Sequence, residues 1–322
     1  MPDTHIHAGL PPVAEDTGPR PVMIAIAGDS AAGKTTLTAG LVQALGPDRV
    51  TGVCVDDYHS YDREERRSLP FTPLSPECNH IEIMEQHLAL LARGQPVLKP
   101  VYEHSTGTFG RQEYVVPREF VIIEGLLPLH SRSMRACFDV RVFLDPPEEI
   151  RRAWKVHRDC SKRGYTAEQV LAELERREHD SATYIRPQRS HADIVVRFHP
   201  ATDAGAEDTL SATVLLRPTI RHPDLSQVLT DDTRRAMHLS LMRDEDGKPV
   251  DALYIDGRAP REVSRTVEEH IWSELDVPGT LPRALGRIDP EVRSEPLALS
   301  ELILLFHMLQ AQSAATSGAA RA

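Results

Sequence analysis

The stretch VMIAIAGDSAAGKTTLTAGLVQAL, residues 22–45, decides the fold of this chain. Its first part, 22–28, is an apolar run with β-branched residues, which predicts a buried parallel strand. Residues 35–45 have helical spacing and end at Gly46-Pro47, a normal helix stop. Between them, GDSAAGKT at 28–35 fits the pattern GxxxxGK[ST] in the strand-to-helix context that this pattern requires. That context disfavours the alternative of an ordinary glycine turn.

The chemistry of this loop suits a nucleotide phosphate. Backbone N–H groups wrap the β-phosphate, and the helix that follows points its positive N-terminus at the same anion. Lys34 is expected to reach the β- and γ-phosphates, and the Thr35 hydroxyl to ligate Mg²⁺. We therefore predict that ATP and Mg²⁺ bind here. The predicted nucleotide-binding residues are Gly28, Asp29, Ser30, Ala31, Ala32, Gly33, Lys34, Thr35 and Thr36.

Length and composition set limits on the class of protein. The chain has 322 residues, enough for one large α/β domain or a domain with an appendage. Its net charge of −11 disfavours non-specific binding to nucleic acid or an anionic membrane. No uninterrupted apolar run is long enough to span a bilayer, and the N-terminus lacks the pattern of a signal peptide. Four widely spaced cysteines argue against a disulfide framework and a zinc site, and suit a cytoplasmic location.

Strands alternate with helices along the first 200 residues. This alternation predicts an α/β fold with a mainly parallel, doubly wound sheet that carries helices on both faces. Further strands are expected at 49–55, 119–125, 139–145 and 192–198, and helices at 79–94, 146–164 and 166–185.

The pattern changes after Pro200. A polar loop at 201–208 precedes predicted strands, a turn at Asp246-Gly247 and a helix, which indicates an α+β extension of the core. An amphipathic helix is expected over 298–312. The predicted division is a disordered leader at 1–20, the phosphate-loop domain at 21–200, the extension at 201–275, and a linker, terminal helix and tail at 276–322.

The segment VDDYHSYDR, residues 55–63, follows the second predicted strand. Ligands in a doubly wound sheet bind beyond the carboxyl ends of the strands, so this segment should lie near the phosphate loop. Asp56 or Asp57 could act as a base toward an acceptor hydroxyl. On an extended strand the two side chains would point to opposite sides, so with Asp56 as the base Asp57 is expected to orient the loop or to cap the charged helix at 63–67. His59 and Arg63 are suited to binding a phosphate on that acceptor. The alternative is an acidic N-cap followed by a solvated charged helix.

Two further positions have polar residues of this kind. In KPVYEHSTG, at 99–107, Tyr102 and His104 are two apart and would share one side of an extended segment. The alternative there is a surface hairpin. Glu124 ends the third predicted strand, where an acid can hold Mg²⁺ or its water. Its alternative role is that of a capping acid.

The segment WKVHRDCSKRG, residues 154–164, carries a basic helical face formed by Lys155, Arg158 and Lys162. Such a helix could act as a lid that brings cations to a transferred phosphoryl group. Basic residues also favour helix C-termini on their own, so a solvated helix end is the alternative.

Taken together, the motifs resemble one family. GDSAAGKT, VDDYHSYDR, KPVYEHSTG, VIIEGLLPLH, AWKVHRDCSKRG and YIRPQRSHADIVV occur in this order between residues 22 and 200. They resemble the phosphoribulokinases, especially the cyanobacterial and plant form. The resemblance implies a P-loop kinase core that phosphorylates the C1 hydroxyl of ribulose 5-phosphate with MgATP, a step of the Calvin cycle. We also expect a homodimer.

The resemblance also implies roles for individual residues. Asp56 matches the general base, and Lys34, Lys155, Arg158 and Asp159 match other catalytic groups. The implied substrate ligands are His59, Arg63, Tyr102, His104 and Arg163, and the implied Mg²⁺ ligands are Thr35, Glu124 and Asp56. A uridine kinase-like enzyme, another sugar or nucleoside kinase, and a nucleotide-binding regulator without turnover remain the alternatives.

The chain departs from the plant form at two places. Ala32 stands where that form has a regulatory cysteine, although the partner cysteine is present as Cys54. Residues 251–269 lack the C-terminal cysteine pair. Redox control through these pairs is therefore not expected.

Overall fold

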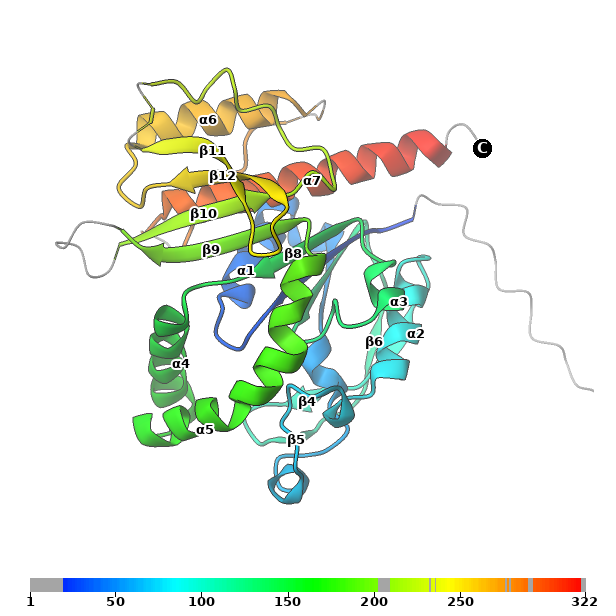
Figure 1. The fold of residues 1–322 in the computed structure, drawn as a ribbon. Coiled ribbons are helices and arrows are strands. Elements are labelled where there is room, and N and C mark those ends of the chain that lie inside the picture. The colour runs from blue at the N-terminus through cyan, green and yellow to red at the C-terminus, as the bar shows by residue number, and fades with distance from the viewer. Residues whose placement is uncertain are drawn as a thin grey trace, which may run out of the picture.

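The structure is a computed structural model that describes residues 20–201, 209–231, 233–234, 236–275, 277, 279–288 and 292–319. The predictions for the N-terminal leader up to residue 19 and for the loop at 202–208 lie outside the described residues. The described chain is built around an eight-stranded sheet with the order β11-β12-β10-β9-β8-β1-β7-β2 (Figure 1).

The five strands from β9 to β2 run parallel and confirm the predicted α/β class. They are β1 (Val22–Gly28), β2 (Val50–Cys54), β7 (Phe120–Gly125), β8 (Val140–Leu144) and β9 (Ile194–Pro200). Every residue of β1 is buried, because helices and other segments cover both faces of the sheet, as is typical of a continuous apolar run in a parallel sheet. The register pairs Ala27 with Gly125 and Cys54 with Glu124, so the carboxyl ends of β1, β2 and β7 meet at one edge.

The sheet continues past Pro200 with three antiparallel strands. β10 (Leu210–Leu216) pairs with β9, and β12 (Pro249–Ile255) lies between β10 and β11 (Met237–Arg243). The same sheet therefore extends from residue 22 to residue 255. The division of the chain into domains at residue 200 stays a prediction.

The helices lie on both faces of the sheet. They are α1 (Lys34–Leu45), α2 (Ile81–Leu91), α3 (Arg132–Arg135), α4 (Glu148–Arg163), α5 (Ala167–Asp180), α6 (Arg261–Ser273) and α7 (Glu295–Ala319). Two small ribbons lie outside the main sheet: β3 (Val97–Lys99) with β6 (Glu113–Val115), and β4 (Tyr102–Glu103) with β5 (Thr108–Phe109). The helix predicted over 166–185 changes type near its end, where a π-helical turn (Ser181–Ile185) follows α5.

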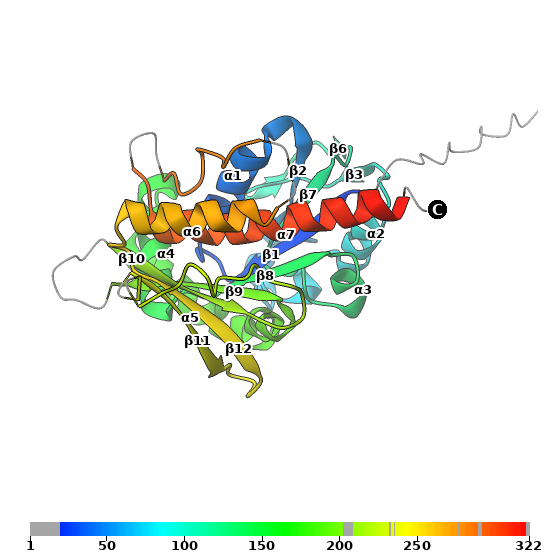
Figure 2. The same cartoon turned by 90° about the horizontal axis from the view of Figure 1, so that it is seen from above.

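The C-terminal helix α7 differs from its prediction. It was expected to be amphipathic, but the side chains from Leu297 to Leu309 are buried around the whole helix. The reason is that α7 packs against α1, α6, β1 and β10 at once, and Figure 2 shows it crossing the sheet below α6. By length and composition alone it is also a candidate membrane span. However, 72% of its most apolar window is buried inside this fold.

Candidate active site

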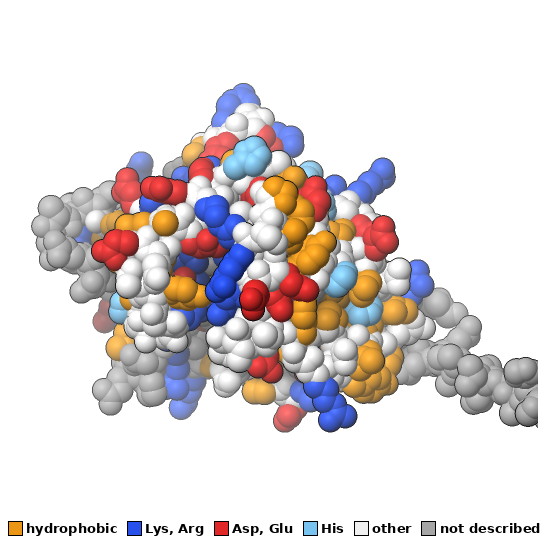
Figure 3. All heavy atoms as spheres, turned by 90° about the horizontal axis from the view of Figure 1, so that it is seen from below, with side chains coloured by type: hydrophobic (Ala, Val, Ile, Leu, Met, Phe, Trp, Pro, Cys, Tyr) orange, Lys and Arg blue, Asp and Glu red, His pale blue; other side chains and the backbone are white. Residues whose placement is uncertain are grey.

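A cavity of about 970 Å³ opens at the carboxyl ends of β1, β2 and β7. The phosphate loop lines one side of it, the segments around Asp56 and Tyr102 line another, and α4 and α5 stand across the opening. In the view from below, basic side chains gather in a central hollow of this face (Figure 3). The structure therefore brings the separate sequence clusters together in one site.

The phosphate loop has the expected position between β1 and α1. The Lys34 ammonium donates hydrogen bonds to the carbonyl oxygens of Gly28 at 2.9 Å and of Asp29 at 3.0 Å, so it lies folded over the loop. Residues 30–36 line the cavity, whereas Gly28 and Asp29 lie outside its lining. The Asp29 side chain is buried and is directed away from the cavity, toward α4 and the end of α5. A nucleotide-binding role for each residue of the loop stays a prediction.

The two adjacent aspartates have separate surroundings. Val55–Tyr58 forms a 3₁₀ turn, so the reasoning that an extended strand directs them to opposite sides was wrong. Asp56 lines the cavity, and its Oδ1 accepts a hydrogen bond from the Leu126 amide at 2.8 Å. Asp57 instead forms an ion pair with the buried Lys99 at 2.5 Å.

Asp57 also accepts a hydrogen bond from the Tyr102 amide at 3.0 Å. Asp57 therefore joins its own turn to the segment at 99–107, and it does not cap the charged helical turn that follows. Asp62 caps that turn, because its Oδ1 accepts from the amides of Glu64 and Glu65, each at 2.8 Å. The expectation that Asp57 orients the loop fits this geometry.

Gly125 makes room for Asp56. Its φ of +151° lies in a region that favours glycine, and a Cβ atom there would lie 2.8 Å from Asp56 Oδ1 and 2.4 Å from Val55 Cγ2. The glycine that ends VIIEG is therefore required to place the candidate base. Its position as the last residue of a buried strand is the sequence signal that could have pointed to this contact.

Glu124 faces the start of α1. Its Oε2 lies 3.5 Å from Thr35 Oγ1 and 3.4 Å from Thr38 Oγ1. Burial raises the pKa of Glu124, the Lys34 charge acts against that rise, and the charge of Asp56 adds to it. A carboxylate whose charge is disfavoured by burial and by a second carboxylate nearby is suited to binding a cation.

The donor set here fits Mg²⁺ better than a metal held by protein alone. Within the described part of the chain, no group of three or more His, Cys, Asp and Glu side chains could hold a metal ion. Two carboxylates, Asp56 and Glu124, and the Thr35 hydroxyl share the cavity. Mg²⁺ is usually held by one or two carboxylates, by phosphates and by water, so these residues are sufficient.

The side of the cavity that is predicted to bind the acceptor, formed by residues 55–63 and 99–107, contains a cluster of aromatic and histidine rings. The ring of Tyr102 lies 4.9 Å from that of His59 and 5.1 Å from that of His104. His59 Nδ1 is 2.8 Å from Asn79 Oδ1, and burial lowers the pKa of His59 to about 4, so this side chain is neutral near pH 7. Arg63 donates to the carbonyl oxygen of His104, which joins the two predicted acceptor segments. The cavity is lined by four of these side chains: His59, Arg63, Tyr102 and His104.

The α4 cations share one carboxylate. Asp159 lies 2.9 Å from Lys155, 2.8 Å from Arg158 and 3.4 Å from Arg163. Lys155 is only 3% exposed, so it is not a solvated helix-end residue. Burial, together with the charge of Arg177, lowers the pKa of Lys155 to about 8. Arg158 also reaches Ser30 of the phosphate loop, with Nη2 at 3.3 Å from Oγ.

Several lining residues were missed from the sequence. They are Arg66, Arg67, Trp154, Tyr165, Arg176 and Arg177. The Arg66 guanidinium lies 4.9 Å from the ring centre of Tyr102 and donates to its hydroxyl. The spacing from Arg63 to Arg66 is a signal that could have identified Arg66, because residues three apart share one side of a helical turn. The position of Arg176 and Arg177 depends on how α5 packs and gave no local signal.

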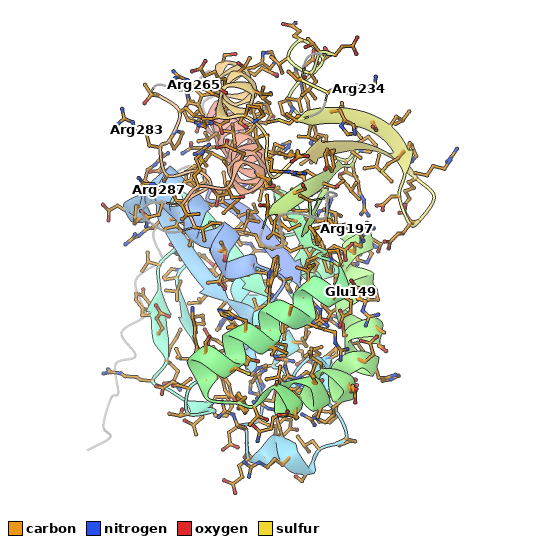
Figure 4. All side chains as sticks on the ribbon, turned by 90° about the vertical axis from the view of Figure 1, so that its left-hand side faces the viewer. Glu149, Arg197, Arg234, Arg265, Arg283 and Arg287 are labelled. Carbon is orange, nitrogen blue, oxygen red and sulfur yellow. The ribbon has the colours of Figure 1, made fainter. Side chains whose placement is uncertain are left out.

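A second, smaller cavity of about 330 Å³ lies elsewhere and is lined by Arg261, Glu268, Leu281, Pro282, Arg283, Arg287, Val292 and Arg293. Figure 4 shows Arg283 and Arg287 next to each other and well apart from Glu149 on α4. None of the site residues predicted from the sequence lines this cavity.

Known proteins resemble this chain in sequence over the part that contains the cavity-lining residues. The family model described as the Phosphoribulokinase / Uridine kinase family matches residues 23–204. A phosphoribulokinase from Synechocystis sp. is 40% identical over 181 residues, which cover 56% of this chain and 54% of that protein. A uridine kinase from Geobacillus sp. is 30% identical over 189 residues, which cover 56% of this chain and 87% of that protein.

A solved structure resembles this chain in fold over a longer part of the chain than the sequence relatives cover. The structure of a phosphoribulokinase from Rhodobacter spheroides matches with a TM-score of 0.57 at 17% identity, covering 80% of this chain and 98% of the other. In sequence, by contrast, the chain spans about half the length of the phosphoribulokinase relatives that it matches.

Proposed function

The chain belongs to the phosphoribulokinase and uridine kinase family, and from this premise we propose that it phosphorylates ribulose 5-phosphate. The γ-phosphoryl group of ATP would be transferred to the C1 hydroxyl, giving ribulose 1,5-bisphosphate and ADP. The observation that carries the proposal is a single cavity in which the phosphate loop, a carboxylate and a ring of cations converge.

In the proposed reaction, Asp56 is the general base. It lines the cavity on the acceptor side, and its Oδ1 is fixed by the Leu126 amide, which leaves Oδ2 for the substrate hydroxyl. Lys34 and the loop amides would hold the phosphates of ATP. Mg²⁺, held by Thr35, Glu124 and Asp56, would supply positive charge to the phosphates when bound.

The sugar phosphate would be bound by His59, Arg63, Tyr102, His104 and Arg163. The one N–H of the neutral His59 donates to Asn79 Oδ1, so Nε2 is left to accept from a sugar hydroxyl. Arg63 offers a charge-assisted contact to the phosphate. Lys155 and Arg158 would neutralise charge on the transferred group, with Asp159 holding them in place. A cavity with this many cations suits an acceptor that already carries a phosphate.

A uridine kinase activity is the second candidate. It is favoured by the uridine kinase relative that the chain covers over 87% of its length, and by the rings of Tyr102, Trp154 and Tyr165 in the cavity. A nucleoside carries no phosphate, however, and leaves the cations around Arg63 without a partner. A nucleotide-binding regulator without turnover is the third candidate.

One experiment separates these candidates. ADP release is measured with ribulose 5-phosphate, uridine and pantothenate in parallel, at equal enzyme and MgATP concentrations. Activity with ribulose 5-phosphate alone supports the proposal. Activity only with uridine or pantothenate refutes it, and no ADP with any acceptor supports the regulator.

We propose in addition a cytoplasmic homodimer that acts in the Calvin cycle and has no nucleic-acid or membrane partner. All four cysteines are free, which suits a reducing compartment. β11 is an edge strand of the sheet with three exposed apolar side chains, Leu239, Leu241 and Met242, and a second copy could pair with it. Light scattering on the wild type and on Leu241→Lys tests this, and a monomeric wild type refutes the dimer.

A further inference from the structure

The junction between α5 and the π-helical turn contacts both the phosphate loop and the segment at 69–75. Figure 1 shows α5 continuing into further helical turns before the chain enters β9. At the junction, two consecutive buried polar residues, Asp180 and Ser181, bind two different loops. π-helical turns within α-helices are frequent at functional sites, and this one has no role in the mechanism above.

Ser181 binds the phosphate loop. Its hydroxyl donates a hydrogen bond to Asp29 Oδ2, and both side chains are buried. Asp29 Oδ1 accepts from the Ser30 amide at 2.6 Å and lies 3.4 Å from the Arg151 guanidinium. Arg151 is itself oriented by Glu148, with two hydrogen bonds of 2.8 Å. Asp29 is thus held on one side by the end of α5 and on the other by the start of α4.

Hydrogen bonds hold the amide, the carbonyl oxygen and the hydroxyl of Ser30. Its amide is bound by Asp29, its carbonyl oxygen accepts from Arg151 at 3.2 Å, and its hydroxyl accepts from Arg158 at 3.3 Å. The next residue, Ala31, has a φ of +65°, a left-handed conformation that costs energy for any residue with a Cβ. Such a conformation persists only where surrounding contacts stabilise it. Here these contacts come from Arg151 and Arg158 of α4 and from Ser181 at the α5 junction.

Asp180 binds the acceptor side. Its Oδ2 accepts from the amide of Thr72 at 2.8 Å and from its hydroxyl at 2.7 Å. Thr72 is buried and precedes Pro73, which lines the cavity. Two neighbouring side chains of one helical junction therefore fix loops that are more than 40 residues apart in sequence.

We propose that Asp180 and Ser181 are positioning residues that couple the nucleotide loop to the acceptor loop at 69–75. Binding of nucleotide at the strained phosphate loop shifts the junction through Asp29 and Ser181, and Asp180 passes this shift to Thr72. The inference rests on the proposed use of ATP but does not depend on which acceptor is used.

The test uses the full chain and a non-hydrolysable ATP analogue with Mg²⁺. Trp154 reports binding by its fluorescence, because its ring lies next to Gly33 of the phosphate loop. We expect Ser181→Ala to weaken binding of the analogue about fivefold or more, a typical size for coupling between sites. Thr183→Ala is the matched control, because it removes a hydroxyl from the same π-helical turn. Within the described part of the chain this hydroxyl bonds to the His179 carbonyl oxygen alone, so the variant should bind the analogue like the wild type.

Hydrogen exchange measures the coupling itself. Addition of the analogue should protect amides of residues 69–75 in the wild type and in Thr183→Ala. This protection should be lost in Ser181→Ala and in Asp180→Asn, at a temperature where thermal unfolding shows all four proteins folded. A merely structural role would lower the melting temperature and leave the transmitted protection intact.

Several results overturn the proposal. These are an absence of protection at 69–75 in the wild type, protection that survives in both variants, and unchanged analogue binding in Ser181→Ala. Failure of ribulose 5-phosphate as a substrate would refute the proposed function and leave this test valid, because neither measurement includes an acceptor.

Discussion

The pair Asp56 and Asp57 offers the sharpest test of the mechanism, because the same substitution should lower turnover at one position and stability at the other. Asp56→Asn keeps an oxygen for the Leu126 amide but removes the proposed base. We expect kcat to fall by about two to four orders of magnitude, the scale of a lost general base. This corresponds to about 3 to 5 kcal/mol of transition-state stabilisation. Nucleotide affinity should change by less than about twofold, because the phosphate loop, Thr35 and Glu124 remain to hold the phosphates of ATP and Mg²⁺.

Asp57→Asn should act on stability instead. It leaves the ammonium of Lys99, whose side chain is 4% exposed, without its 2.5 Å partner; the exposed Glu113, at 3.5 Å, replaces it only in part. Removing one member of a buried ion pair costs about 3 to 5 kcal/mol. Asp57 is partly exposed and Glu113 is nearby, so we expect about 2 to 3 kcal/mol, or a Tm lower by roughly 4 to 10 °C. Near 20 °C, where the variant is folded, kcat should stay within about fivefold of the wild type.

Both variants are measured for ADP release with ribulose 5-phosphate, for binding of a non-hydrolysable ATP analogue, and for thermal unfolding. The reasoning is refuted if Asp57→Asn loses turnover while Asp56→Asn keeps it. It is also refuted if Asp56→Asn lowers the melting temperature as much as Asp57→Asn does, because the loss of activity would then have a structural cause.

Three further predictions concern pH and redox state. The pKa of Lys155 is lowered to about 8, so its positive charge is lost above that pH; kcat should decline there in the wild type, and the decline should move to higher pH in Lys155→Arg. Burial raises the pKa of Glu301 from its ordinary value of 4.5 to about 8, so its contribution to stability is complete below pH 4.5 and is lost as pH rises to about 8. Urea unfolding at pH 5 and pH 8 should show this fall in the wild type and a smaller one in Glu301→Gln. Dithiothreitol should leave activity unchanged, because Ala32 removes the usual partner of Cys54 and burial raises the pKa of that thiol; a large activation by reductant would contradict this.

Much of the fold and the centre of the site followed from local sequence. A β-branched apolar run, a glycine-rich loop and a helix with a clear stop are neighbours along the chain, so residues 22–45 predict their own conformation. The rule that ligands bind at the carboxyl ends of parallel strands then placed the segment around Asp56 next to the phosphate loop, and the structure shows both in one cavity. These inferences need only periodicity, turn chemistry and strand direction.

The tertiary structure decided what depends on contacts between distant segments. Helical periodicity could not show that α7 is covered on several sides, since burial is decided by the neighbouring α1, α6 and sheet. The turn at Asp56–Asp57 forms because Asp57 binds Lys99 and Tyr102, more than 40 residues away. The contact of Ser181 with Asp29 joins residues 152 positions apart. No local pattern encodes such pairs, because they form only when the sheet brings its loops to one edge.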